Sequence, residues 1–240
     1  MVGAVQPGTE FGGYRIEAIE REDAGAAVLI ARNPQEDHSV ALHIAGEPLG
    51  ALATVRFLER AHRLGAVAHP HLLGVYDART LEGRAVAVAQ APPGRRLDEL
   101  LAGGRLGAGR AMRIARQVAS AVDALEEAGA EPPPLTAERI WVDGAGDAHL
   151  DGLDARIALP AASSSAAVAW LVADMAERVP RRLETVLACA REGAYLSASQ
   201  FAGDLRAVEA DAARRRRELA VAIAVLAAGL VAMVLLLTLR

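Results

Sequence analysis

The hydrophobic pattern of this chain changes near residue 90, and this change limits its fold more than any other sequence feature. Before residue 90, apolar residues alternate in short segments separated by turn signals, as in the strands of a sheet. The predicted strands are 14–19, 28–31, 40–44, 73–76 and 85–89. One stretch, 54–64, has its apolar residues at helical spacing instead. The first part of the chain therefore predicts a sheet of five strands that carries one helix.

Beyond residue 97 the pattern becomes mostly helical. Met112, Val118, Val122 and Leu125 fall on one face of a predicted amphipathic helix. Short strands are predicted to return at 140–142 and 148–150. The fold class is therefore α+β, with a β-rich part followed by a helical part.

Composition excludes several kinds of chemistry. All 26 basic residues are arginine, so mechanisms that require a lysine, such as a Walker-type phosphate loop or a Schiff base, are excluded. The single cysteine excludes an intramolecular disulfide bond. A net charge of −4 and 3% aromatic residues argue against a nucleic-acid-binding surface. The histidines show no metal-ligand spacing, so no metal site is expected.

The segment 219–239 contains no charged residue over 21 positions, and as a helix it would span about 31 Å. We predict that it is a transmembrane helix. The preceding residues Arg214, Arg215, Arg216 and Arg217 place the body of the protein in the cytoplasm by the positive-inside rule. The N-terminus lacks the pattern of a signal peptide. The expected location is the cell membrane, with a single C-terminal anchor.

Small residues recur every fourth position along the predicted membrane helix. They are Ala220, Ala224, Ala228 and Ala232. Such a stripe permits two helices to approach closely. A homo-oligomer formed through this helix is therefore one possible assembly.

Several segments, in their order and spacing, resemble the bacterial serine/threonine protein kinases. They are GTEFGGYRIEAIE, VALHIA, RFLERAHRLGAVAHPHLLGVYDA, RLDELLA, ARQVASAVDALEEAGA and AREGAYLSASQFAGDLRAV. The resemblance runs from about Gly8 to Val208 and implies a two-lobe protein-kinase-like fold. It divides the chain into a tail (1–12), an N-lobe (13–90), a shortened C-lobe (91–210), a basic juxtamembrane segment (211–218) and the transmembrane helix (219–239).

The resemblance places the nucleotide-binding positions of the N-lobe on unsuitable residues. The three glycines of the phosphate-binding loop fall on Arg21, Asp23 and Ala26. The strand lysine that holds the α- and β-phosphates falls on His43, and its glutamate partner falls on Arg60. His43 alone, inside an apolar strand, would be taken for an ordinary core residue.

The catalytic loop shows the same pattern of loss. The family's His-Arg-Asp falls on Pro132, Pro133 and Pro134, so the catalytic base is replaced and the backbone is stiff. The asparagine that binds a metal ion falls on Arg139.

The Asp-Phe-Gly motif, which supplies the other metal ligand, is also missing from its expected position. Gly152, Leu153 and Asp154 stand there instead. Asp151 and Asp154 flank the position of the metal ligand, and we expect both to be solvated turn residues. Only about a dozen residues separate Asp154 from the next apolar helix. That length is too short for an activation segment and the peptide-docking platform that follows it in the family.

Together these replacements predict a pseudokinase, which is a kinase-like protein without catalytic activity or a bound cofactor. It would act as a signalling adaptor or regulator at the cytoplasmic membrane face, and its partners would be an active kinase or a phosphopeptide-binding adaptor. Two alternatives remain open. One is a switch that binds ATP without metal, and the other is residual, atypical kinase activity that uses His43, Asp151 and Asp154.

Overall fold

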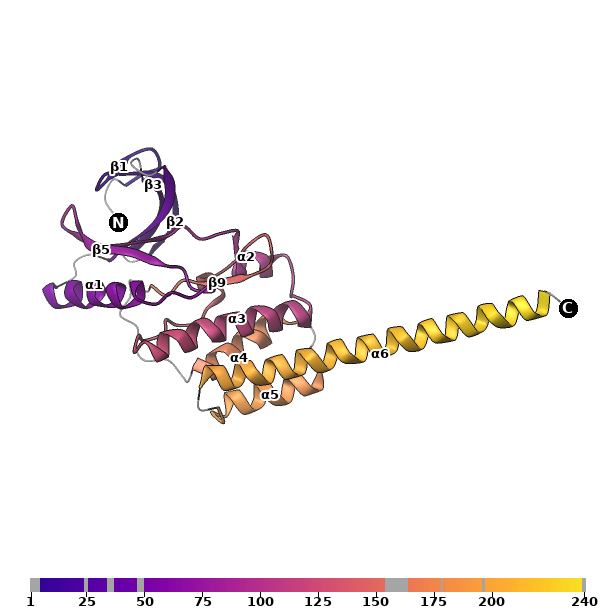
Figure 1. The fold of residues 1–240 in the computed structure, drawn as a ribbon. Helices are drawn as coiled ribbons and strands as arrows, with labels where there is room; N and C mark the ends of the chain where they lie inside the picture. The colour runs from indigo at the N-terminus through magenta and orange to yellow at the C-terminus, as the bar shows by residue number, and fades with distance from the viewer. Residues whose placement is uncertain are drawn as a thin grey trace.

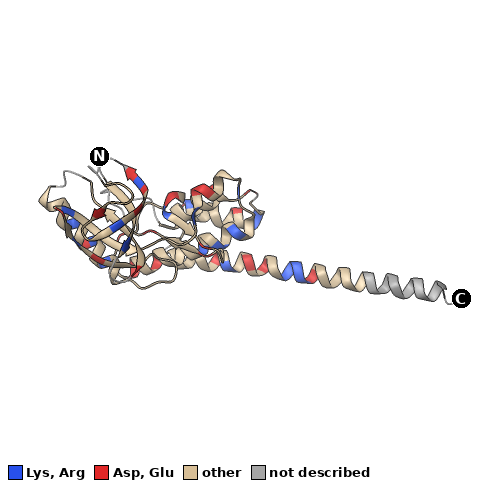
Figure 2. Ribbon diagram, turned by 90° about the horizontal axis from the view of Figure 1, so that it is seen from above, with Lys and Arg blue, Asp and Glu red and all other residues tan. Residues whose placement is uncertain are grey.

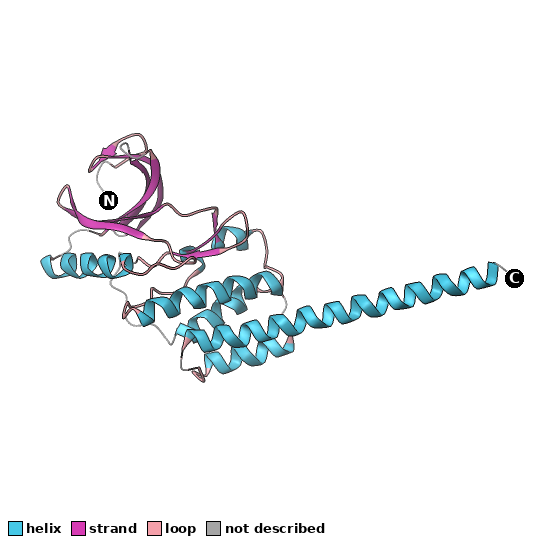
Figure 3. Ribbon diagram, viewed as in Figure 1, coloured by secondary structure: helices cyan, strands magenta, loops and turns pink. Residues whose placement is uncertain are grey.

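The structure is a computed structural model that describes most of the chain. The described ranges are 5–23, 26–33, 37–46, 50–153, 164–177, 179–195 and 197–238. For Asp23 and residues 227–238 within these ranges, the structure describes the backbone but not the side chains. In Figures 1 and 3 the strands gather in an N-terminal lobe and most helices in a C-terminal lobe.

The N-lobe is an antiparallel sheet that curls over one helix (Figure 1). Its strand order is β1-β2-β3-β4-β6-β5. The strands are β1 (Glu10–Phe11), β2 (Tyr14–Asp23), β3 (Ala26–Asn33), β4 (His38–Ile44), β5 (Val75–Leu81) and β6 (Arg84–Gln90). Helix α1 (Ala51–Gly65) packs its buried face, with Phe57, Ala61 and Leu64, beneath β5 and β6. This face carries apolar residues three and four positions apart, as a helix that covers a sheet requires.

The sheet differs from the sequence prediction in two places. It has six strands instead of five, because Glu10–Phe11 pairs with β2 and buries Phe11. The segment 1–12 is therefore not simply a tail. The strand predicted at 73–76 begins later, at Val75, because the Leu73 N–H donates to the Leu150 carbonyl of the C-lobe at 2.9 Å.

The C-lobe is built around a long helix, α3. Its elements are β7 (Arg95–Arg96), α2 (Leu97–Ala102), α3 (Ala108–Glu127), a 3-10 turn (Ala137–Arg139), β8 (Ile140–Val142), β9 (Ala148–Leu150), α4 (Ser164–Met175), α5 (Arg181–Arg191) and α6 (Ala198–Thr238). The strands predicted at 140–142 and 148–150 are confirmed. Helix α3 contacts α4, α6 and β9 and supplies much of the core, including Ile114, Val118 and Val122.

Helix α6 continues without a break from the C-lobe core to Thr238. Its 41 residues correspond to about 60 Å. Phe201 and Leu205 in its first turns are buried in the C-lobe, whereas the later turns extend away from the body (Figure 1). The basic segment expected at 211–218 is therefore part of the same rigid helix as the end of the C-lobe.

Among the residues that the structure describes, none belongs to a helix with a stretch long and apolar enough to cross a membrane. Within the predicted span 219–239, the backbone is described up to Thr238 but the side chains only up to Leu226.

A glycine at the junction between the lobes allows a close backbone contact. Gly94 has φ +73°, and a Cβ there would overlap the Val142 carbonyl of β8. Gly83, in the turn between β5 and β6, has a similar φ of +78° but open space around its Cα.

These two glycines provide a matched test of the junction. Gly83→Ala should cost about 1–2 kcal/mol of unfolding free energy, because alanine is strained at positive φ. Gly94→Ala should lower the unfolding free energy by about 1–3 kcal/mol more than Gly83→Ala does, because its new methyl group overlaps β8. Equilibrium urea unfolding of both variants measures the difference. Equal losses would contradict the close approach of Gly94 to β8.

Candidate functional site

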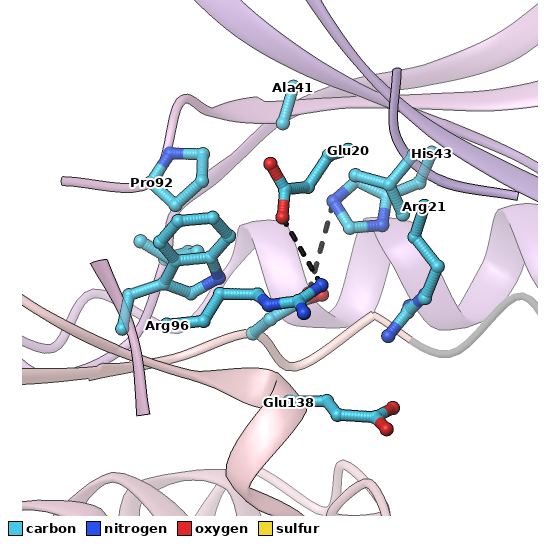
Figure 4. Close-up of a pocket in the computed structure, with 11 residues that line it drawn as sticks. Glu20, Arg21, Ala41, His43, Pro92, Arg96 and Glu138 are labelled. Atoms are coloured by element: carbon cyan, nitrogen blue, oxygen red, sulfur yellow. Dashed lines mark hydrogen bonds and ion pairs between the residues drawn. The ribbon is translucent and has the colours of Figure 1, made fainter. Parts of the chain in front are cut away.

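The cleft between the lobes is the place where the kinase resemblance puts a nucleotide. The residues that line it come from both lobes: Glu20, Arg21, Val28, Ala41, His43, Leu73, Pro92, Arg96, Glu138, Trp141 and Asp151 (Figure 4). The cavity volume is about 20 Å³, which is room for about one water molecule. Among the described residues, the side chains therefore leave little enclosed space in this cleft.

An ion pair crosses the cleft. The Glu20 carboxylate at the end of β2 lies 3.3 Å from the Arg96 guanidinium of β7, and Figure 4 shows this contact. Arg96 is also paired with Asp98 at 2.8 Å, which fixes the guanidinium on the C-lobe side. Burial raises the pKa of Glu20, and the nearby Arg96 charge opposes that rise. The pair joins the two lobes across the space that a nucleotide would need.

His43 and Asp151 face each other deeper in the cleft. His43 on β4 is 2% exposed, and its Nε2 atom lies 3.9 Å from the Asp151 carboxylate. The Asp151 carboxylate also accepts the Leu153 N–H at 3.0 Å. Asp151 is 7% exposed, so the expectation that it is a solvated turn residue is wrong.

The segment after β9 brings Asp151 into the cleft. The resemblance puts the phosphate-holding lysine on His43, and the residue opposite His43 is Asp151 rather than Gly152. The assignment of Gly152, Leu153 and Asp154 to the Asp-Phe-Gly motif stays a prediction, because Asp154 lies outside the described residues. A Cβ at Gly152 would lie 3.2 Å from Leu64, so α1 packs closely against this glycine.

Arg139 is a buried cation at the base of the cleft. It is 2% exposed, and its Nη1 atom donates to the Leu153 carbonyl at 2.6 Å. Its own carbonyl accepts the Asp151 N–H at 2.8 Å. Arginine has no lone pair to offer a metal ion, so this side chain stabilises the 151–153 segment without being able to act as a ligand. No group of metal-ligating side chains occurs among the described residues.

The remaining predicted positions lie in different surroundings. Arg21 lines the cleft, and Ala26 lies on β3 opposite Asp23. Arg60 donates to the Glu131 carbonyl at 3.3 Å and does not line the cleft.

The proline segment Pro132, Pro133 and Pro134 has no regular secondary structure, and it is absent from the cleft lining. Asp154 and the side chain of Asp23 lie outside the described residues. The expectation that Asp154 is a solvated turn residue therefore stays a prediction.

Sequence reasoning missed the two features that fill the cleft, the Glu20–Arg96 pair and Trp141. Trp141 is 9% exposed and lies on β8, two residues after Arg139. Arg139 belongs to the 3-10 turn before β8 and not to the strand, so strand alternation gave no signal for Trp141. The Glu20–Arg96 pair joins residues 76 apart in the chain, and no local pattern signals it.

The charges in the cleft offset one another. Three carboxylates line it, from Glu20, Glu138 and Asp151, against the guanidinium groups of Arg21 and Arg96. Three carboxylates would repel a triphosphate, whose binding needs an excess of positive charge or a metal ion. Pro92, on the wall, has no N–H to donate to a purine. The arrangement is suited to holding the lobes together.

Comparisons with known proteins bear on the family. No family model matches the chain. The serine/threonine-protein kinase PknE of Mycobacterium tuberculosis is 29% identical over 146 residues, which cover 60% of this chain and 26% of PknE. PknJ of the same species is 28% identical over 131 residues, which cover 54% of this chain and 22% of PknJ. The matched region is thus about a quarter of the length of these relatives.

Solved structures agree with the fold. A crystal structure of the Mycobacterium tuberculosis PknI kinase domain aligns with a TM-score of 0.71 and 18% identity, and it covers 87% of this chain and all of that domain. A variant of the same domain aligns with a TM-score of 0.72. The chain therefore has the fold of a protein kinase domain, and its relatives by sequence are bacterial serine/threonine protein kinases.

Proposed function

We propose that the chain is a catalytically inactive kinase-like protein that is anchored in the membrane and acts by binding a protein partner at the cytoplasmic face. The observation that supports this most is the cleft, in which paired side chains leave room for about one water molecule. The partner class follows from the kinase resemblance, and an active kinase or a phosphopeptide-binding adaptor is the proposed partner.

The chemistry of phosphoryl transfer supports inactivity. The transition state is stabilised by positioned cations and metal ions, and the substrate hydroxyl gives its proton to a catalytic aspartate. Here Arg139 stands at one metal-ligand position, and Pro134 stands at the position of the catalytic aspartate. Asp151 remains, but it lacks a second ligand to share a metal ion.

The membrane anchor is supported by sequence and by exposure. The first residues of the uncharged segment are large, apolar and exposed on α6: Leu219, Val221, Ile223, Val225 and Leu226. Exposed apolar side chains on several sides of an isolated helix are typical of a surface that lipid or another protein covers. The arginine run before them supports a cytoplasmic body.

A nucleotide-responsive switch is the second candidate. It is favoured by the buried pair of His43 and Asp151, which face each other across the cleft. Pro92 and the Glu20–Arg96 pair oppose it, because they remove a backbone donor and occupy the entrance.

Thermal unfolding of the full chain in detergent micelles tests nucleotide binding. ATP with Mg²⁺, and ATP with EDTA, should leave the midpoint unchanged because the cleft is occupied. Ligand at 100-fold above its dissociation constant would raise the midpoint by about 5–10 °C. A rise of that size in either condition would favour the switch, and dependence on Mg²⁺ would show that Asp151 holds a metal ion.

A phosphoryl-transfer assay with radiolabelled ATP tests residual enzyme activity. The full chain should transfer no more label than a sample without protein, because the catalytic base and a metal ligand are replaced. The variants His43→Ala and Asp151→Asn should behave the same way. Transfer that either variant abolishes would contradict the proposal and establish an atypical kinase.

The proposed structural role of Arg139 predicts an effect on stability. Arg139→Asn places the family's metal-ligand type in this chain, but it removes a charged hydrogen bond to the Leu153 carbonyl. We expect a loss of about 1.5–3 kcal/mol in urea unfolding. The exposed control Arg56→Asn should change stability by about 0.5 kcal/mol or less. Equal effects of the two variants would show that Arg139 does not stabilise the segment after β9.

A further inference from the structure

Two histidines in the loop between α1 and β5 connect the N-lobe to the C-lobe. The His71 carbonyl accepts the Leu150 N–H of β9 at 2.9 Å, and the Nδ1 atom of the same residue lies 3.0 Å from the Ala148 carbonyl. A carbonyl oxygen can only accept, so Nδ1 of His71 carries a proton. The His69 Nε2 atom lies 3.1 Å from the Ser120 hydroxyl of α3. Both histidines therefore bond to the C-lobe.

The contacts of His69 require a neutral ring. Its Nδ1 atom accepts the His71 backbone N–H at 3.2 Å, so this nitrogen must keep its lone pair. The proton of the neutral ring is then on Nε2, which donates to the Ser120 hydroxyl. A proton on Nδ1 would place two N–H groups against each other and break the bond to His71. Protonation of His69 therefore acts directly on the residue whose carbonyl holds Leu150.

The surroundings of the two rings disfavour protonation. The ring centres of His69 and His71 are 5.6 Å apart, and that of His149 on β9 lies 6.3 Å from His71. A charge on one of these rings disfavours a charge on the next. Burial lowers the pKa of His69 and of His71, and the His71 ring lowers the pKa of His69 further. The bond to the Ala148 carbonyl acts in the opposite direction on His71.

Charged groups of both signs face His71. Asp147, just before β9, favours the charged ring, but it is paired with Arg113 at 2.7 Å. Basic and acidic residues are interspersed over the body (Figure 2), so no field of a single sign overrides these local contacts. The cavity that His71 lines has a volume of about 180 Å³, which is enough for water to bring a proton to the ring. The charged residues that line the same cavity are Arg116 and Asp123 of α3 and Arg206 of α6.

We propose that this loop is a pH-responsive latch between the lobes, which is closed while His69 and His71 are neutral and opens when they take up protons. Opening releases the Leu150 N–H from the His71 carbonyl. Asp151 follows Leu150 and faces His43, so an open latch loosens one wall of the cleft. The proposal concerns regulation of the fold and does not depend on the proposed anchor or partner.

The pH range of the latch follows from the direction of the pKa shifts. A histidine in an open segment has a pKa of about 6.5. Because the closed latch lowers the pKa of both histidines, the open form binds more protons as the pH falls below that value. The latch is thus strongest above about pH 6.5 and weakens below it. A histidine that stays neutral in the closed form shifts the opening equilibrium by about tenfold between about pH 7.5 and pH 5.5.

Amide hydrogen exchange of the full chain in detergent micelles tests the latch. Protection factors of the Leu73 and Leu150 amides are measured, because they remove the direct effect of pH on exchange chemistry. Both should fall by about tenfold between about pH 7.5 and pH 5.5. Amides of α5, which contains no histidine, should change by less than about twofold. Unchanged protection at Leu73 and Leu150, or an equal fall in α5, would overturn a latch confined to the junction.

A matched pair of variants assigns the effect to His69. Asparagine has an oxygen where His69 has Nδ1, so His69→Asn can accept the His71 N–H without titrating. This variant should lose most of the pH dependence at Leu73 and Leu150. His62→Asn removes an exposed histidine of α1 and should keep the full pH dependence. The same pH dependence in both variants would overturn the role of His69.

The His69 ring itself provides a test that needs no variant. Nitrogen nuclear magnetic resonance of the imidazole should show the proton on Nε2 at about pH 7.5, and titration should give a pKa below about 6.5. A proton on Nδ1, or a pKa above about 6.5, would overturn the latch because the His71 N–H would then lack its acceptor.

Discussion

A short run of backbone hydrogen bonds joins the two lobes, and the shape of the cleft depends on it. The Leu73 N–H donates to the Leu150 carbonyl, and the Leu150 N–H donates to the His71 carbonyl, each at 2.9 Å. This contact brings the end of β9 beneath the N-lobe sheet, so the next residue, Asp151, faces His43. Because buried backbone groups are costly to leave unpaired, the junction fixes the relative position of the lobes.

The side chains in the cleft follow from that fixed geometry. In a kinase cleft that holds neither a nucleotide nor a metal ion, carboxylates from the two lobes would lie close together with no positive charge to neutralise them. Here arginines supply the neutralisation: Arg96 pairs with Glu20, and the buried Arg139 holds the Leu153 carbonyl beside Asp151. Buried charges in proteins are paired or hydrogen-bonded for this reason. The proposed loss of phosphoryl transfer is therefore consistent with a cleft whose charges are neutralised by the protein's own arginines.

Much of the fold could be predicted from the sequence, and less of the site. Periodicity located α1 and α3, because each buries one face and shows it in its apolar spacing, and the short strands β8 and β9 were also predicted at their observed positions. The short strand β1 was missed, since only Phe11 in it is buried. In the site, His43 was correctly identified as a buried residue of a strand, but Asp151 was expected to be solvated and is buried. Its position follows from the contacts of the preceding Leu150 with the distant Leu73 and His71, which no local pattern contains.

A nuclear magnetic resonance titration of the Trp141 indole N–H most directly tests whether the cleft is closed to nucleotide. The chain has two tryptophans, and Trp170, which is exposed on α4 and absent from the cleft lining, provides an internal reference. With the cleft filled by its own side chains, adding ATP with Mg²⁺ should leave both indole signals where they are. A saturable shift of the Trp141 signal alone would show that nucleotide enters the cleft, and would contradict a site closed by the Glu20–Arg96 pair.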